Sequence, residues 1–117
     1  MSSPNAAPKL DLDSAQLARA YERESATRQF DSGKHLVADL AVAPGERVLD
    51  VGCGTGRLAE HIADVVGPGG SVLGIDPLPE RIAIARERAR ANLAFAIGDA
   101  RDLVGLGDAR FDVVVLN

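Results

Sequence analysis

A nine-residue stretch in the middle of the chain, VLDVGCGTG at 48–56, constrains the fold more than any other feature. An apolar run typical of a buried strand leads into three glycines at alternate positions, Gly52, Gly54 and Gly56. Glycine adds no packing area and costs backbone entropy, so its use here indicates a main chain that needs room. An amphipathic helical pattern follows at 57–66. The order strand, glycine loop, helix predicts that the main chain passes very close to a bound cofactor.

The rest of the chain alternates short apolar runs with helical patterns. Strands are predicted at 71–75, 93–97 and 111–116, a helix at 79–91, and a short helix or turn at 100–110. This order is typical of an α/β fold of the Rossmann-like kind, a parallel sheet with helices on both faces. Ligands of such sheets bind at the carboxyl ends of the strands.

Before the first strand the chain has a different character. Residues 1–10 are interpreted as a flexible tail, 11–43 as an N-terminal helical segment, and 44–117 as the sheet domain. We expect the helical pattern to be broken at Gly33. Tyr21 and Phe30 are interpreted as core or lid packing, with cover of the cofactor by Tyr21 as the alternative.

Composition narrows the function. A net charge of -4 and a pI of about 5.1 argue against a nucleic-acid partner, and no apolar run is long enough to span a membrane. The N-terminus lacks the pattern of a secretory signal, so a cytoplasmic location is expected. The single cysteine excludes a disulfide framework, and His35 and His61 share no metal-ligand spacing, so no metal site is predicted.

Two kinds of cofactor suit a glycine loop of this type. Dinucleotides use G-x-G-x-x-G/A, and the third position of that pattern is Arg57 here, whose long side chain would crowd a pyrophosphate. The spacing therefore argues against NAD without excluding it.

Four motifs together resemble the class I S-adenosylmethionine-dependent methyltransferases. They are VLDVGCGTG at 48–56, IDP at 75–77, GDA at 98–100 and FDVVVLN at 111–117. The similarity is greatest to small-molecule enzymes of the ubiquinone-biosynthesis and arsenite-methylating type, and it covers their N-terminal portion only. It implies that 44–117 is a partial cofactor-binding domain, with the first strand between the second and the fourth.

The resemblance assigns roles to the first strand and its loop. Asp50 would anchor the amino group of the methionine part of S-adenosylmethionine, and the backbone of Gly52, Cys53 and Gly54 would line the aminocarboxypropyl chain. Gly56 would let the following helix pack close to the sheet. A turn-capping role is the alternative for Asp50. The Cys53 side chain is interpreted as a small buried residue, with a redox role as the alternative.

Further roles fall on the tips of the other strands. Asp76 would accept hydrogen bonds from both ribose hydroxyls, and Pro77 would pack near the adenine. Asp99 would accept from the adenine amino group with Ala100 beside it, and Asn117 would face the methyl donor and the acceptor. Turn roles are the alternatives for Asp76 and Asp99. Four arginines at 81, 86, 88 and 90 are interpreted as a solvated helix surface rather than a phosphate site.

The predicted function is methyl transfer to a small-molecule acceptor without an assigned catalytic residue. The family's sheet continues beyond its fourth strand, so the fourth strand here is expected at an edge, where the run VVVL at 113–116 favours self-association. Two alternatives stay open. One is a fragment of an NAD-type oxidoreductase, and the other is a non-catalytic remnant or interaction module.

Overall fold

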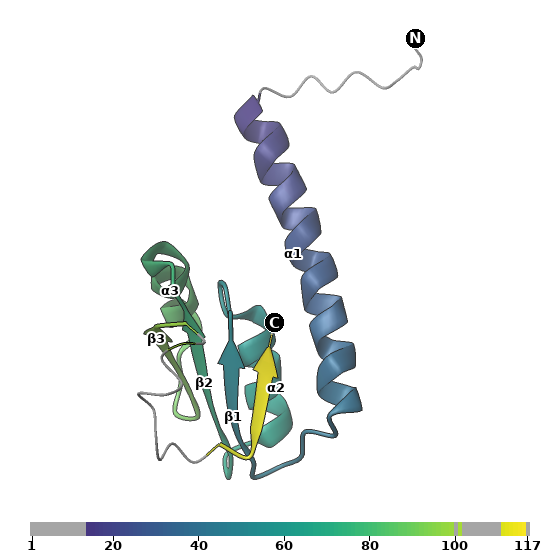
Figure 1. Cartoon of the computed structure of the whole chain (residues 1–117), viewed down its shortest axis with the longest axis vertical. Coiled ribbons are helices and arrows are strands. Elements are labelled where there is room, and N and C mark those ends of the chain that lie inside the picture. Colours follow the sequence, from purple (N-terminus) through teal and green to yellow (C-terminus); the bar gives the residue numbers. More distant parts are fainter. Residues whose placement is uncertain (1–13, 100, 102–110, 117) are drawn as a thin grey trace.

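The computed structural model describes residues 14–99, 101 and 111–116. Its elements, in chain order, are α1 (Ser14–Asp39), β1 (Arg47–Val51), α2 (Arg57–Val66), β2 (Ser71–Asp76), α3 (Pro79–Ala85), the 3₁₀ helix η1 (Arg86–Arg88), β3 (Leu93–Ile97) and β4 (Val113–Leu116). The four strands form one parallel sheet in the order β3-β2-β1-β4 (Figure 1). This confirms the Rossmann-like fold and the place of the first strand between the second and the fourth.

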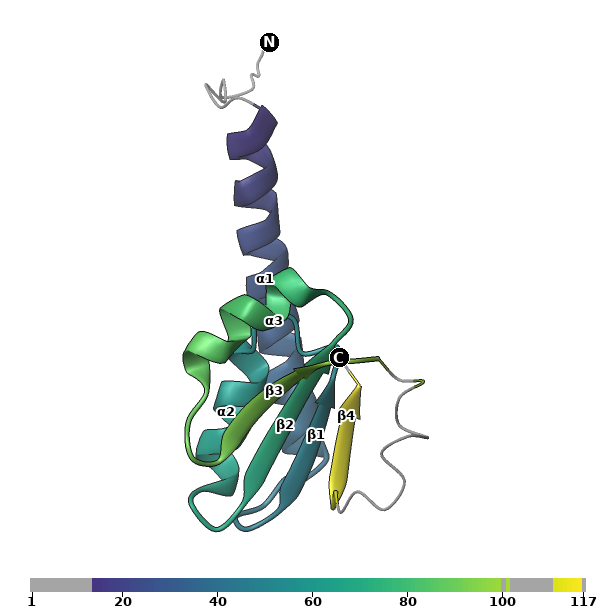
Figure 2. The ribbon, with the colours of Figure 1, turned by 90° about the vertical axis from the view of Figure 1, so that its left-hand side faces the viewer.

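The core lies between the helices and one face of the sheet. Figure 2 shows how the helices and strands that enclose it are arranged. Four valine and leucine side chains of neighbouring strands form the floor of this core: Val48, Val72, Leu93 and Val115. The amphipathic stripe of α2 and the buried residues of α3 cover them, including Leu58, Ile62, Val66, Ile82 and Ala85. Burial of these apolar groups fixes α2 and α3 against the sheet and so places the start of each helix above the strand tips.

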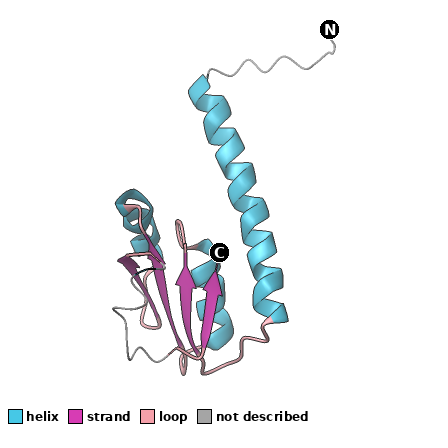
Figure 3. Ribbon diagram, viewed as in Figure 1, coloured by secondary structure: helices cyan, strands magenta, loops and turns pink. Residues whose placement is uncertain are grey.

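Helix α1 is continuous through Gly33, so the predicted break is wrong. A Cβ atom at this position would lie 2.6 Å from Leu58 Cδ2, and Gly33 is buried. The glycine is therefore a close contact between α1 and α2 rather than a helix breaker. Beyond this contact the N-terminal part of α1 extends past the sheet, as the long cyan helix in Figure 3 shows.

Helix α3 ends earlier than the predicted 79–91. It stops at Ala85, continues as η1 to Arg88, and Ala89 then takes an extended conformation with φ -59° and ψ 143°. The next residue, Arg90, exchanges main-chain hydrogen bonds with Leu93 at the start of β3. The chain must leave the helix here in order to enter the sheet in parallel register with β2.

The opposite face of the sheet carries a smaller apolar cluster of Leu49, Val51 and Ile75, with Phe111 packed against it. The described helices α1, α2 and α3 all contribute to the other face, and the predicted helix or turn at 100–110 lies outside the described residues except for Arg101. Within the described part of the chain, no helix is both long and apolar enough to cross a bilayer.

Candidate functional site

Two buried carboxylates lie close together at the tips of neighbouring strands. Asp50 of β1 lies in register with Gly74 of β2, and Asp76 is the last residue of β2. Their exposed fractions are 0% and 2%. Because parallel strands point the same way, both acids fall at the carboxyl edge of the sheet, where the sequence predicts the ligand.

The loop between β1 and α2 turns through three glycines with positive φ, namely 77° at Gly52, 57° at Gly54 and 88° at Gly56. A Cβ on Gly54 would meet no atom within 4 Å, whereas one on Gly56 would lie 2.8 Å from Phe95 Cζ of β3. Gly54 thus leaves bare main chain facing open space, and Gly56 allows α2 to start directly against the sheet.

Asp76 connects this loop to the start of α3. Its Oδ2 accepts a hydrogen bond from the Gly54 N–H at 3.0 Å, and its Oδ1 accepts one from the Leu78 N–H at 3.0 Å. The Arg81 guanidinium lies 3.8 Å from Oδ2. Each carboxylate oxygen has two lone pairs, so both oxygens keep the capacity to accept a further hydrogen bond from a ligand.

Asp50 has no such partners. Neither of its carboxylate oxygens makes a hydrogen bond within the described structure, although both are buried. Burial, and then the charge of Asp76, raise the pKa of this carboxyl to about 7. A buried polar group without a partner is costly, so it needs an explanation, and a ligand that supplies hydrogen-bond donors is one.

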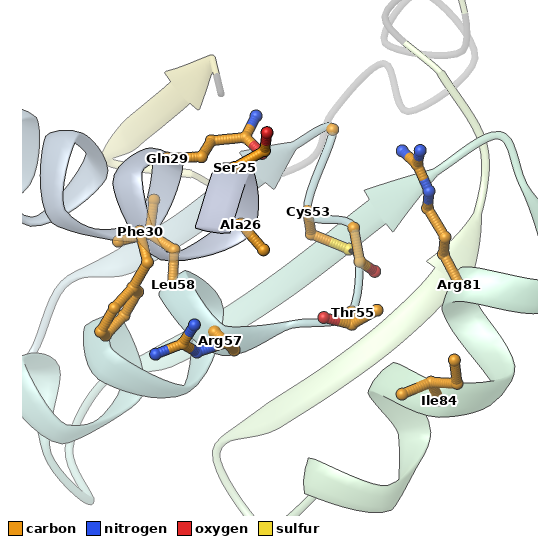
Figure 4. A pocket seen from close by; sticks show the side chains of 12 residues that line it. Ser25, Ala26, Gln29, Phe30, Cys53, Thr55, Arg57, Leu58, Arg81 and Ile84 are labelled. Atoms are coloured by element: carbon orange, nitrogen blue, oxygen red, sulfur yellow. Dashed lines mark hydrogen bonds between the residues drawn. The ribbon is translucent and has the colours of Figure 1, made fainter. Parts of the chain in front are cut away.

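A cleft of about 470 Å³ opens beside the glycine loop. Figure 4 shows its walls: Ser25, Ala26, Gln29 and Phe30 on α1, Cys53 and Thr55 on the loop, and Arg81 and Ile84 on α3. Gly52, Gly54, Arg57 and Leu58 complete the lining. The cleft therefore combines apolar walls with exposed loop main chain, which suits a small organic ligand.

The structure brings most of the predicted site residues to this edge. Cys53 is buried in the cleft wall, and burial, followed by the charges of Asp50 and Asp76, raises the pKa of its thiol to about 12. Its neutral, packed thiol supports the interpretation of a small buried residue. Pro77 is exposed just beyond β2.

Asp99 follows β3 and is paired within its own turn. Its carboxylate accepts hydrogen bonds from the main chain and the guanidinium of Arg101. Ala100 and Asn117 lie outside the described residues, as does the side chain of Tyr21. Phe30, the other aromatic candidate of the N-terminal segment, packs against the core and lines the cleft.

Sequence reasoning missed two arginine contacts at this site. Arg57 turns its guanidinium over the Phe30 ring, with Cζ 4.4 Å from the ring centroid, and so joins the start of α2 to α1. Arg88 donates from Nε to the Thr55 carbonyl at 3.0 Å. The prediction of a solvated surface is wrong for Arg88, because its guanidinium is bonded to the glycine loop. Helical periodicity carries no signal for this contact, since the two residues are 33 positions apart in the chain.

Neither histidine lies in a cluster of metal-ligating side chains among the described residues. His35 is exposed, and His61 contacts the edge of the Phe30 ring with centroids 6.2 Å apart. Over the residues that the structure describes, no group of three or more histidine, cysteine or acidic side chains is placed to hold a metal ion.

Comparison with known proteins gives the site its context. The family described as "Methyltransferase domain" matches residues 43–117, which include the glycine loop and both buried acids. The chain belongs to this methyltransferase family. The prediction of a class I S-adenosylmethionine-dependent methyltransferase, N-terminal portion, is thereby confirmed. The match favours that class over a dinucleotide-dependent oxidoreductase.

Individual relatives differ in what they act on. An arsenite methyltransferase of Aquipseudomonas alcaligenes is 38% identical over 104 residues, which cover 80% of this chain and 29% of that protein. An rRNA 2'-O-methyltransferase fibrillarin of Debaryomyces hansenii is 37% identical, covering 64% of this chain and 25% of that protein. The chain thus spans about a quarter to a third of these two relatives.

The fold likeness extends to a liganded structure. Aeropyrum pernix fibrillarin, solved with natively bound S-adenosyl-L-methionine, has a TM-score of 0.59 and 28% identity over 65% of this chain and 35% of its own. S-adenosylmethionine is therefore the cofactor of the family to which this chain belongs. The fibrillarin relatives leave the expected small-molecule acceptor, and the expected lack of a nucleic-acid partner, without confirmation.

Proposed function

We propose that this chain forms the cofactor-binding part of an S-adenosylmethionine-dependent methyltransferase. The observation that carries the proposal is the Asp50 carboxylate, which is fully buried without a hydrogen-bond partner in the described structure, next to bare glycine main chain. A ligand that brings a cation with N–H donors to this point would satisfy both oxygens. The ammonium group of the methionine part of the cofactor has this chemistry.

The remaining contacts suit the other parts of the same molecule. The aminocarboxypropyl chain would lie along Gly52, Cys53 and Gly54, where the missing Cβ of Gly54 leaves open space. Asp76, whose two oxygens each keep a free lone pair, would take the two ribose hydroxyls.

The adenine would then lie toward the next strand tips. We propose Pro77 as its packing surface and Asp99 with Ala100 as the partners of its amino group. Asn117 is proposed to face the methyl donor and the acceptor, at the end of the strand that pairs with β1 on its other side.

The chemistry asks little acid–base work of the protein. When bound, the cofactor would supply an electrophilic sulfonium methyl group. The acceptor would bond to the methyl carbon in line with the breaking carbon–sulfur bond, and the neutral thioether would leave. The chain's own residues would hold the cofactor in one orientation, which lowers the entropic part of the barrier. The α1 wall would exclude water from one side, and none of the described cleft residues is a histidine, aspartate or glutamate placed as a general base.

We propose a small molecule as the acceptor. The net charge of -4 supports this, because RNA-binding surfaces concentrate lysine and arginine. The test is methyl transfer from isotopically labelled cofactor by the full-length protein, with arsenite, quinols and rRNA offered in parallel. Label in the RNA fraction alone would replace the small-molecule proposal.

Cofactor binding is tested directly by isothermal titration calorimetry with S-adenosylmethionine and with its demethylated product. We expect saturable binding of both and no binding of NADH, which serves as the control. Absence of heat with either methyl-donor ligand, together with no displacement in competition, would overturn the proposal. Cofactor binding without methyl transfer to any acceptor would support the proposed cofactor site but not the proposed activity. It would favour the alternative of a non-catalytic module.

A further inference from the structure

An arginine holds the glycine loop at a second point, one residue beyond the Gly54 N–H that donates to Asp76. Arg88 Nε donates to the Thr55 carbonyl at 3.0 Å, and Arg88 Nη1 donates to Glu60 Oε1 at 3.0 Å. Thr55 lies between Gly54 and Gly56 in the loop, and Glu60 lies in the first turn of α2. One guanidinium thus joins the loop to the helix that the loop begins.

The position at which α3 ends allows Arg88 to make this contact. Because the helix tightens into η1 at Arg86–Arg88, the Arg88 side chain reaches back over the start of α2. The planar guanidinium presents its N–H groups in a fixed fork, so the Glu60 carboxylate that receives Nη1 also sets the direction of Nε toward Thr55.

Two consecutive residues of the loop are therefore held by side chains of other elements. The Gly54 N–H is bonded to Asp76, and the Thr55 carbonyl is bonded to Arg88. A glycine-rich loop samples many main-chain conformations when it is not held, and a ligand must then pay the entropy of ordering it. Holding the peptide groups before the ligand arrives removes that loss from the binding step.

We propose that Arg88 is a positioning residue of the cofactor site, which orients the Thr55 peptide while Glu60 orients Arg88. This inference rests on the proposed function, since the loop is the proposed seat of the cofactor. Arg88 does not line the cleft, so it acts on the cofactor through the loop rather than by contact.

The chain offers a matched control in Arg90. It also pairs with a carboxylate of α2, Asp64, which lies four residues after Glu60. Its hydrogen bonds go to Asp64, the Glu60 main chain and Asn92, none of which belongs to the glycine loop. Arg90→Ala therefore removes a similar arginine–carboxylate pair without releasing the loop.

The experiment compares Arg88→Ala, Arg88→Lys and Arg90→Ala in the full chain. Each is measured for its urea unfolding midpoint and for its Kd for S-adenosylmethionine by calorimetry. We expect Arg88→Ala to raise Kd by about tenfold, Arg88→Lys to restore part of the affinity, and Arg90→Ala to leave Kd unchanged at a similar loss of stability. Equal Kd values in the two alanine variants would overturn the inference, whereas no binding by the wild type would overturn the proposed function.

A second measurement needs no cofactor. Amide hydrogen exchange reports the Gly54 N–H, which is protected by its bond to Asp76. We expect faster exchange at Gly54 in Arg88→Ala and in Glu60→Gln, and wild-type exchange in Arg90→Ala. Unchanged exchange at Gly54 in Arg88→Ala would show that the loop does not depend on this arginine.

Discussion

The carboxylate of Asp76 accepts a hydrogen bond from the main-chain N–H of Gly54, 22 residues earlier, at 3.0 Å. This contact ties the tip of β2 to the loop that follows β1. The acid proposed to bind the ribose therefore also shapes the loop proposed to bind the rest of the cofactor.

The double role of Asp76 predicts a large effect of its removal. We expect Asp76→Ala to weaken cofactor binding by roughly 1–3 kcal/mol, because the ribose hydroxyls and the Gly54 N–H both lose their acceptor. Calorimetry measures the change in Kd. The control is Asp112→Ala, which removes a carboxylate that also accepts a main-chain N–H, from Arg47, at the opposite end of the sheet. An unchanged affinity in Asp76→Ala would remove Asp76 from the site.

The buried Asp50 carboxyl predicts how stability depends on pH. Its pKa is raised from 3.8 to about 7, so the folded protein holds more protons than the unfolded chain between these values. The stability that this group contributes is fully present below about pH 4 and is lost as the pH rises through about 7.

Asp50→Asn removes this titration. We expect the free energy of unfolding of the cofactor-free wild type, relative to the variant, to fall by roughly 2–4 kcal/mol between about pH 4 and about pH 8. Urea denaturation of both proteins across this range gives the difference. Parallel pH profiles in the two proteins would show that Asp50 ionises normally in the fold.

The same group predicts a proton released on cofactor binding. The ammonium proposed to contact Asp50 favours the ionised carboxylate, so binding near pH 7 expels part of a proton from the site. Calorimetry in two buffers of different ionisation enthalpy measures this release, and affinity should fall as the pH is lowered through about 7. Asp50→Asn should show neither effect; a buffer-independent heat for the wild type contradicts the contact.

Two glycines of the loop predict different outcomes for the same substitution. Gly56→Ala forces a Cβ to within 2.8 Å of Phe95 at a φ of 88°, so we expect a loss of stability of about 2–4 kcal/mol. Gly54→Ala meets open space, so its cost is about 1–2 kcal/mol from its φ of 57°. The new Cβ at position 54 lies where the cofactor is proposed to bind. We therefore expect Gly54→Ala to lose more cofactor affinity than Gly56→Ala, relative to the stability that each variant loses. Thermal unfolding and calorimetry separate the two losses.

The β4 edge predicts association between copies of the chain. Within the described sheet β4 pairs with β1 alone, and Val114 and Leu116 are 45% and 66% exposed. We expect the apparent mass in size-exclusion chromatography to rise with concentration, and Val114→Lys to suppress the rise because a charge on an edge strand opposes pairing. A concentration-independent monomer would remove this edge as an interface.

Hydrophobic periodicity predicted the sheet because each strand is a short buried run and parallel order follows from the helices between them. The bounds of α2 and β3 agree with the prediction for this reason. The tips of the strands were predictable as well, since parallel strands bring their carboxyl ends to one edge. The position of Asp50 and Asp76 thus followed from the pattern, whereas the missing partners of Asp50 did not.

Contacts across the chain were not predictable from local pattern. Gly33 has the propensity of a breaker, whereas in the structure it lies inside α1 and packs against the Leu58 side chain, where a Cβ would not fit. Arg88 lies in a run of charges that reads as solvated, and its bond to Thr55 arises from the turn into η1. Both depend on where α2 lies, which a single helical pattern does not encode.

Helix α1 contacts α2 at Gly33, close to the C-terminal end of α1, so a small change of tilt at this contact moves the distant N-terminal end most. The helix starts at Ser14, which is about 28 Å from Gly33 at 1.5 Å per residue, and the cleft wall lies between these points. A tilt of about 10° at Gly33 would move the N-terminal end of α1 by roughly 5 Å. A residue larger than glycine at position 33 would push α1 away from Leu58 and so shift the α1 residues that form the cleft wall.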